Sequence, residues 1–286
     1  MIPRSRGRTG ARRQRRPSAR LRRRQGRHFL RRPEILAEIA ALAGIGPRQT
    51  VLEIGCGEGF LTAALAEQAC KVLAVEVDRR LIEVARRNLL PAPNVALLCA
   101  DILSLDLRRL PPGIVAVGNL PYSIATPIIF RCLEHLERFA SLTFTVQLEV
   151  AERLVAKPAT KPYSVLSVAV QLRCHVEALL SIPRRAFSPP PRVDSAVVRF
   201  LPLREPPVPA AEQPQLLRVV RTAFAQRRKT LRNALLGAGW LDWRGGDIDA
   251  CLQRLGIAPQ RRGETLSLAE FAALARAVPR PPAGRP

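Results

Sequence analysis

The segment TVLEIGCGEGFLTAALAEQA, residues 50–69, carries the clearest fold signal in this sequence of 286 residues. Residues 50–55 form a short apolar run that ends in glycine, which is typical of a buried strand, and residues 60–69 have helical spacing. Gly55, Gly57 and Gly59 stand between them. Glycines in such a turn allow a ligand to approach the backbone, and the free N–H groups of the helix N-terminus point at it. We therefore expect a strand, a ligand-binding turn and a helix.

Strands and helices continue to alternate after this first unit. Further apolar strands are predicted over residues 71–78, 94–101, 113–121, 141–146 and 194–203, and helices over 79–89 and 127–136. This alternation indicates an α/β fold in which helices cover both faces of a parallel sheet.

The chain divides into three predicted parts. The Pro-rich stretch REPPVPAAEQP, residues 204–214, follows the last predicted strand and marks a break. Helical patterns then follow over residues 215–236, 247–256 and 267–278. We predict a disordered basic tail over residues 1–27, an α/β domain over 28–203 and a small all-helical domain over 204–286.

The charge of the chain is strongly positive. It has 46 basic and 23 acidic residues, a net charge of +23, and residues 1–32 contain fourteen arginines and no acidic residue. This excess indicates a polyanionic partner. Nucleic acid is favoured over a membrane surface because no amphipathic helix organises the basic segment. The preference for arginine over lysine fits phosphate recognition and, equally, a GC-rich genome.

The six cysteines and three histidines show no metal-ligand spacing. Most of the cysteines fall in apolar runs, as buried reduced thiols do. No signal peptide or membrane-length apolar span is recognisable. We therefore expect a cytoplasmic protein with no metal site and no membrane contact.

Acidic residues end the second and third predicted strands. Glu76 stands where a carboxylate can accept both hydroxyls of a ribose, and Asp101 offers an acceptor for the amine of an adenine. The turn GCGEG lacks the G-x-G-x-x-G spacing of dinucleotide sites. The three strand ends therefore favour S-adenosylmethionine over NAD. The alternative is a tight turn with a solvated acid at 76 and a helix N-cap at 101.

The fourth strand end carries GNLPYSIATP, residues 118–127. The Asn119 side-chain oxygen and the Pro121 carbonyl can each accept one N–H of an aromatic amino group, while Tyr122 stacks on its ring. Two acceptors favour a pyramidal nitrogen whose lone pair can attack a methyl group, so the chemistry depends on positioning. No His or Lys is adjacent in sequence to serve as a base. The alternative is a type I turn beside a core tyrosine.

These motifs resemble those of the small-subunit (16S) ribosomal RNA adenine-N6 dimethyltransferases, the KsgA-like family, from about residue 26 to residue 271. GRHFL is similar to the GQNFL element of that family, with Arg27-His28 in place of Gln-Asn. The other matching segments are VLEIGCGEGFLT, VEVD, NLPYSIATPIIF, QLEVAERLVAKPATKPYSVLSVAVQ, FSPPPRVDSAVV, AFAQRRKTLRNAL and RRGETLSLAEF.

The resemblance implies a class I methyltransferase fold of seven strands, one of them antiparallel, and a helical RNA-binding domain. It implies that S-adenosylmethionine dimethylates two adjacent adenines in the 3′-terminal hairpin loop of 16S rRNA, within the 30S subunit or its precursor. We expect a monomer. The expected cofactor contacts are His28, Leu30, Gly55, Gly57, Glu76, Asp101 and Asn119. The expected target-base residues are Asn119, Pro121, Tyr122 and Phe187, with Phe187 stacking on the second face of the base. Taken alone, Phe187 is a core residue.

A basic segment, AQRRKTLRN, lies in the helical part. Arg227, Arg228, Lys229 and Arg232 are spaced so that several share a helix face, which predicts a phosphate track. Charge alone would fit a solvated face equally well.

Two other functions stay open. A 23S rRNA adenine methyltransferase that confers macrolide resistance shares the glycine turn and the target-base motif. A non-catalytic RNA-binding or ribosome-assembly factor could keep the same fold. The segments QLEVAERLVAKP and AFAQRRKTLRN favour the 16S enzyme, and the intact NLPY favours catalytic activity.

Overall fold

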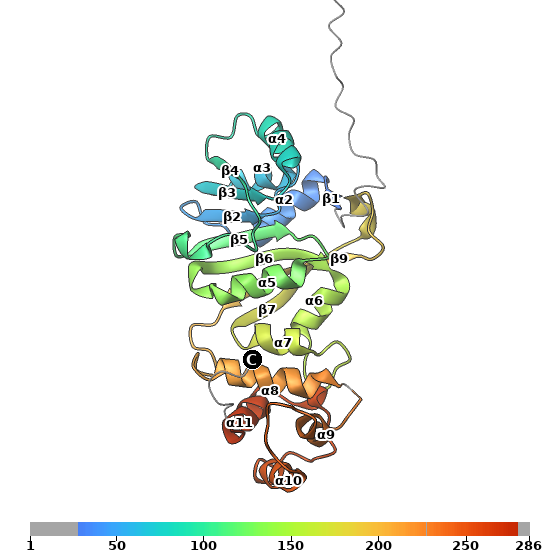
Figure 1. Ribbon diagram of the computed structural model, residues 1–286. Coiled ribbons are helices and arrows are strands. Elements are labelled where there is room, and N and C mark those ends of the chain that lie inside the picture. Colours follow the sequence, from blue (N-terminus) through green and yellow to red (C-terminus); the bar gives the residue numbers. More distant parts are fainter. Residues whose placement is uncertain (1–27, 227, 280–286) are drawn as a thin grey trace, which may run out of the picture.

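The computed structural model describes residues 28–226 and 228–279 (Figure 1). The strands are β1 (Phe29–Leu30), β2 (Thr50–Ile54), β3 (Lys71–Glu76), β4 (Val95–Cys99), β5 (Ile114–Asn119), β6 (Phe139–Gln147), β7 (Cys174–Ile182), β8 (Phe187–Ser188) and β9 (Ser195–Pro202). The α-helices are α2 (Pro33–Leu42), α3 (Phe60–Ala66), α4 (Arg79–Asn88), α5 (Ala125–Glu134), α6 (Leu148–Val155), α7 (Val165–Gln171), α8 (Gln213–Ala225), α9 (Leu231–Leu236), α10 (Gly245–Arg254) and α11 (Leu268–Ala277).

Seven strands form one sheet in the order β4-β3-β2-β5-β6-β9-β7. The first five pair in parallel, and β9 pairs antiparallel with both β6 and β7. The sheet therefore contains one antiparallel strand, as the family resemblance predicted. The strand order reverses between β2 and β5, and ligands of open α/β sheets bind outside the carboxyl ends of strands at such a point.

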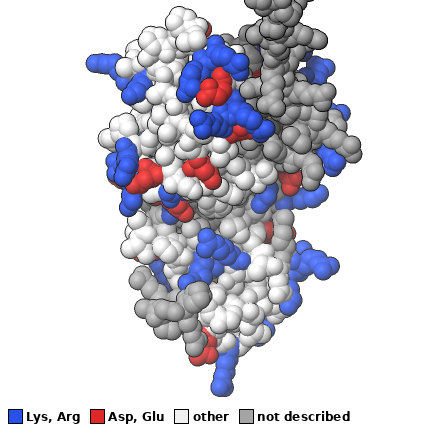
Figure 2. Space-filling view, turned by 45° about the horizontal axis from the view of Figure 1, so that its top comes forward, with Lys and Arg blue, Asp and Glu red and all other residues white. Residues whose placement is uncertain are grey.

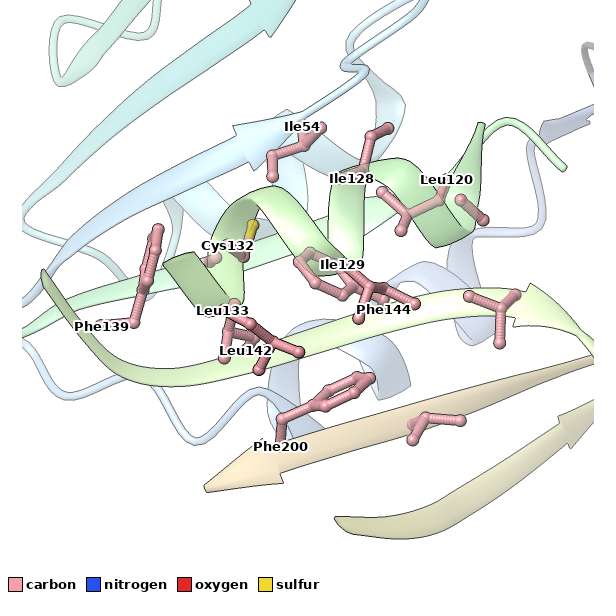
Figure 3. Close-up of a cluster of buried hydrophobic side chains, with 14 of the residues drawn as sticks. Ile54, Leu120, Ile128, Ile129, Cys132, Leu133, Phe139, Leu142, Phe144 and Phe200 are labelled. Atoms are coloured by element: carbon pink, nitrogen blue, oxygen red, sulfur yellow. The ribbon is translucent and has the colours of Figure 1, made fainter. Parts of the chain in front are cut away.

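Helices cover both faces of this sheet, which confirms the prediction from strand and helix alternation. On one face, Ile129 and Leu133 of α5 pack over Leu142 and Phe144 of β6 and Phe200 of β9 (Figure 3). Side chains of α6 and α7 extend the same apolar layer. Helices α2, α3 and α4 cover the other face. The burial of apolar surface on both faces fixes the strand ends relative to one another.

A two-stranded sheet joins the N-terminal segment to the segment before β9. β1 and β8 pair antiparallel, with Phe29 opposite Ser188 and Leu30 opposite Phe187. The sequence patterns did not predict these strands, because two residues cannot show a periodicity. Their pairing places HFL beside FSPPP, and both segments then reach the functional site described below.

The helical part is built from α8 to α11 around its own buried cluster, to which Val168 and Leu172 also contribute (Figure 1). The single helix expected over residues 215–236 is wrong, since α8 and α9 are separate helices. The Thr230 hydroxyl accepts a hydrogen bond from the backbone N–H of Asn233 (3.3 Å) and caps the start of α9. Because Val168 and Leu172 share this core, the domain boundary after residue 203 stays a prediction.

Basic side chains spread over both the α/β part and the helical part on the face seen in Figure 2. The Arg-rich tail predicted over residues 1–27 lies outside the described residues. Within residues 28–226 and 228–279, no helix combines the length and the apolar character needed to span a membrane.

Candidate active site

A cavity of about 340 Å³ opens where β2, β3 and β5 end and just beyond the end of β4. This volume falls within the roughly 300–1,000 Å³ that is typical of small-molecule sites. Five of the residues predicted to contact the cofactor line this cavity: His28, Gly55, Glu76, Asp101 and Asn119. The structure therefore brings together residues that lie as far apart as positions 28 and 119.

Glu76 fixes the glycine turn between β2 and α3. Its carboxylate oxygens accept hydrogen bonds from the backbone N–H groups of Gly57 (3.2 Å) and Asp78 (2.9 Å). Gly57 has a φ of +57°, and a Cβ at this position would lie 3.1 Å from Cε1 of Phe29. Glycine is therefore required at this turn. The Glu76 oxygens keep further lone pairs, which a ribose hydroxyl could occupy.

Gly57 and Leu30 do not line the cavity, although both were predicted to contact the cofactor. Gly57 acts on the turn through its bond to Glu76. Leu30 is buried in the apolar cluster that includes α2 and α3. Both residues therefore support the site without lining the cavity.

Asp101 begins the turn that follows β4. Its Oδ1 accepts a hydrogen bond from the backbone N–H of Leu103 (2.9 Å), so the residue does cap this turn. It is also exposed and lines the cavity. The capping role and a cofactor contact are therefore compatible, because Oδ2 makes no hydrogen bond to a described residue.

The side-chain amide of Asn119 is oriented by the N-terminal segment. Its Nδ2 donates a hydrogen bond to the backbone carbonyl oxygen of His28 (3.0 Å). The amide oxygen Oδ1 is therefore left as an acceptor, and Asn119 lines the cavity. Gly118, the residue before it, lets β5 approach β2 closely, since a Cβ there would lie 2.5 Å from the carbonyl oxygen of Ile54.

The Pro121 carbonyl oxygen accepts a hydrogen bond from the backbone N–H of Ile124 (3.0 Å). The motif therefore does form a turn, as the simpler interpretation anticipated. A carbonyl oxygen has a second lone pair, so this bond leaves room for another donor.

Tyr122 lines the cavity, and a hydrogen bond at its hydroxyl group fixes the ring. The hydroxyl lies 2.6 Å from Oγ of Ser195. Burial raises the pKa of Tyr122, so the phenol is neutral. The ring is half-buried and lines the cavity, which distinguishes it from an ordinary core tyrosine.

His28 lies beside Tyr122, with ring centroids 5.3 Å apart. Its Nδ1 is 2.8 Å from the carbonyl oxygen of Pro189. A carbonyl oxygen only accepts, so Nδ1 of His28 donates this hydrogen bond. Arg27, which departs from the family pattern together with His28, lies outside the described residues.

A second cavity, of about 820 Å³, adjoins the first and shares His28 and Tyr122 with it. Phe187 lines this cavity although only 3% of its surface is exposed. Its backbone is held by pairing with Leu30. Phe187 is therefore both a core residue and a neighbour of the site, on the same cavity as Tyr122.

Glu53 is a candidate functional residue that the sequence patterns did not identify. It lies within β2, only 1% of its surface is exposed, and Oε2 has no hydrogen-bond partner among the described residues. Burial raises the pKa of Glu53 to about 7. A carboxylic acid in an apolar strand just before the glycine turn was the signal that could have identified it.

Arg31 ties the N-terminal segment to the glycine turn. Its Nη2 donates to the Glu58 carboxylate, with a distance of 2.8 Å to Oε1. The guanidinium also lies over the Phe60 ring, 5.7 Å from the centroid. Sequence reasoning missed this contact because it joins two loops across the fold.

Of the predicted phosphate track, Arg228 and Lys229 lie in the turn between α8 and α9, and Arg232 lies in α9. Arg228 and Lys229 are exposed there, while Arg227 lies outside the described residues. Arg232, at the start of α9, forms a bidentate ion pair with Asp249 of α10, at 2.7 and 3.0 Å. Its guanidinium therefore holds two helices together. In the described part of the chain, no cluster of three or more His, Cys, Asp or Glu could hold a metal ion.

The strand order, the single antiparallel strand β9 and the cavity at the strand ends define a class I methyltransferase. A dimethyladenosine transferase from Plasmodium falciparum has a similar structure, with a TM-score of 0.74 over 86% of this chain and 96% of that one, at 28% identity. The 23S rRNA methyltransferase ErmE matches with a TM-score of 0.69, over 87% of this chain and 99% of that one, at 29% identity.

The chain belongs to the ribosomal RNA adenine dimethylase family, whose model matches residues 18–276. Ribosomal RNA small subunit methyltransferase A of Geobacter sulfurreducens is 44% identical over 259 residues, which cover 88% of this chain and 93% of that protein. The protein of the same name from Anoxybacillus flavithermus is 41% identical over 87% of both chains. These similarities confirm the family that the motifs indicated.

Proposed function

We propose that this protein uses S-adenosylmethionine to dimethylate N6 of two adjacent adenines in the 3′-terminal hairpin loop of 16S rRNA, within the 30S subunit or its precursor. The Asn119 amide carries the proposal. Its bond to the His28 carbonyl oxygen (3.0 Å) leaves Oδ1 to accept a hydrogen bond from an amino group. Relatives named small subunit methyltransferases, at 41% and 44% identity, support the small subunit as the target.

The cavity fits S-adenosylmethionine by the chemistry of its lining. Glu76 and Asp101 supply acceptors for ribose hydroxyls and an adenine amine. No Lys or Arg is among the described residues that line it, so a cationic ligand is not repelled. When bound, S-adenosylmethionine supplies an electrophilic methyl carbon on a positively charged sulfur.

The target adenine needs two acceptors for its exocyclic N–H groups. Oδ1 of Asn119 takes one, and the second lone pair of the Pro121 carbonyl oxygen takes the other. Together they favour a pyramidal nitrogen and aim its lone pair away from the ring. Because the proton leaves only after methyl transfer, no base has to act first. The residues contribute mainly by positioning.

Two aromatic rings would hold the adenine in place. The Tyr122 ring is fixed through its hydroxyl bond to Ser195 (2.6 Å), and Phe187 is fixed by the β1–β8 pairing. Both residues line the second cavity, next to the first. A base extruded from an RNA loop and stacked between aromatic side chains is the usual arrangement in base-modifying enzymes.

The remaining parts of the chain receive supporting roles in this proposal. Residues 28–203 bind the cofactor and the target base, and residues 204–286 bind RNA. Arg228 and Lys229 are exposed and can reach phosphates, whereas Arg232 acts through its ion pair with Asp249. We infer a monomer, since a single chain supplies both cavities, and a cytoplasmic location, since the proposed substrate is rRNA.

Mass spectrometry of rRNA from a strain that lacks this protein tests the proposal. Two adjacent dimethyladenines should be absent from 16S rRNA and should return when the protein is expressed. The similarity to ErmE makes a 23S rRNA substrate the second candidate. Loss of methylation only in 23S rRNA would refute the 16S assignment. A folded protein that incorporates no methyl group into under-methylated 30S particles would have a binding role alone.

A further inference from the structure

Besides Tyr122 and Phe187, which we propose hold the target adenine, the second cavity is lined by residues that have no role in methyl transfer so far, among them Gln147, Arg185 and Arg192. We propose that this part of the cavity binds the nucleotide adjacent to the adenine being methylated, with Gln147 reading the base and Arg185 and Arg192 holding its phosphate. This inference rests on the proposed function, since it assumes an RNA substrate whose target adenine has an adenine neighbour.

The position of the cavity supports this assignment. It shares His28 and Tyr122 with the cofactor cavity, so a base at Tyr122 would lie next to both cavities. Its volume of about 820 Å³ is more than twice that of the cofactor cavity. A nucleotide next to the extruded adenine cannot occupy the place of the methyl donor, so we assign it to this adjoining cavity.

The charge of the lining identifies the ligand as an anion. The basic residues of the lining are Arg184, Arg185 and Arg192, and no acidic residue is among the described residues that line it. Arg184 is engaged, since its Nη1 donates to the backbone carbonyl oxygen of Arg192 (3.1 Å). Arg185 and Arg192 are exposed and form no ion pair with a described residue. Guanidinium groups in this state are well suited to bidentate contacts with a phosphate.

Gln147 adds a group that can read a base. It ends β6 directly opposite Ser195, the residue whose hydroxyl holds Tyr122. It also lies two positions after Thr145, which pairs with Asn119, so Gln147 and Asn119 share a face of the sheet. Its side chain lines the cavity and makes no hydrogen bond to a described residue. An amide presents one donor and one acceptor, which match N7 and the N6 amine of adenine.

The decisive experiment measures methyl transfer to reconstituted small subunits in which the neighbour of the target adenine is replaced by purine. Purine lacks the N6 amine but keeps the ring. Replacements are made on either side of the target, and methylation at the target is quantified by mass spectrometry. The wild type should prefer an adenine neighbour over purine by about tenfold in kcat/KM on one side. Gln147→Ala should abolish this preference, so that the kcat/KM values for the adenine and purine neighbours become about equal.

Unchanged preference in Gln147→Ala would overturn the assignment of Gln147. Isothermal titration with S-adenosylhomocysteine shows whether that variant is folded, because its cofactor cavity is intact. If the wild-type protein methylates the subunit but shows no preference between adenine and purine neighbours, the proposed subsite is wrong and the proposed function still stands. Wild-type protein that transfers no methyl group defeats the proposed function instead.

A second measurement tests the phosphate contacts. The double variant Arg185→Ala/Arg192→Ala should bind the small subunit more weakly. Its slope of log affinity against log salt should be shallower by about 0.7, which corresponds to one phosphate of a single strand. Arg48→Ala is the matched control, because Arg48 is exposed and precedes β2 at the opposite edge of the sheet. An equal loss in both proteins, or no loss in either, would contradict a phosphate site in this cavity.

Discussion

Two cavities that share His28 and Tyr122 differ in the sign of their charge. Among the described residues, the cofactor cavity is lined by the carboxylates of Glu76 and Asp101 and by no Lys or Arg. The adjoining cavity is lined by three arginines and no acid. The first therefore suits a cationic ligand and the second an anionic one. We propose that methyl transfer takes place at their boundary, where Asn119 and Tyr122 contact His28.

The largest expected effect comes from removing the amide at this boundary. Asn119→Ala should lower methyl transfer by about 10³-fold, comparable to the loss of one aimed hydrogen-bonding group in other enzymes. Cofactor affinity should fall only moderately, because the carboxylates remain. Single-turnover transfer and calorimetry measure the two quantities. Asn233→Ala, an exposed change in α9, is the control. Near-normal turnover would mean that Asn119 does not position the target.

Glu76→Gln should separate the two cavities. The carboxylate accepts hydrogen bonds from Gly57 and Asp78, and an amide would place N–H groups against one of these donors. We expect cofactor affinity to fall by roughly 10- to 100-fold, as for other hydrogen bonds to a charged group. RNA affinity should be unchanged, as measured by filter binding. Glu83→Gln, which alters an exposed ion pair with Arg86, is the control. An equal loss of RNA affinity would show that the two cavities do not bind the cofactor and the RNA separately.

Deleting residues 1–24 tests whether RNA binding depends on the cavity alone. This segment contains eleven arginines and lies outside the described residues. Its loss should weaken RNA binding and flatten the salt dependence, since each phosphate contact contributes a slope of about 0.7 to 0.9. Cofactor affinity serves as the internal control, because the deletion leaves every residue of the cofactor cavity in place. An unchanged slope would assign RNA binding to residues 25–286.

The smallest effect concerns the acid beneath the glycine turn. Burial raises the pKa of Glu53 to about 7, whereas the ordinary pKa of a glutamate carboxyl is 4.5. The raised pKa stabilises the folded state below pH 4.5, and this contribution is lost as the pH rises to 7. Because Glu53→Gln cannot ionise, its Tm should increase relative to the wild type between pH 5 and pH 8. A constant difference in Tm over this range would show that Glu53 is not buried in its acid form.

The sequence predicted the part of the fold in which local pattern and tertiary structure agree. The strands β2, β3, β4, β5, β6 and β9 fall within their predicted ranges or extend them by two residues or fewer at either end. β7 was missed, because its segment CHVEALLSI mixes polar and apolar residues without strict alternation. The helix predicted over residues 215–236 was too long, because the apolar spacing continues past Thr230, which caps the start of a separate helix, α9.

The residue types of the candidate site were visible in the sequence, but their contacts were not. The bonds of Asn119 to His28 and of Tyr122 to Ser195 join positions 91 and 73 residues apart. A single sequence holds no signal for such pairs. Glu53 was missed for a different reason, because the burial that raises its pKa is a property of the folded protein and not of the strand pattern.

The most direct test is a crystal structure of the protein with S-adenosylhomocysteine and an RNA fragment that carries the target loop. We predict that S-adenosylhomocysteine lies in the cofactor cavity beside Glu76 and Asp101. We also predict an extruded adenine whose amine donates a hydrogen bond to Oδ1 of Asn119. The phosphate of its neighbour should contact Arg185 or Arg192. An adenine bound elsewhere, or an Asn119 amide turned so that Nδ2 faces the base, would contradict the account.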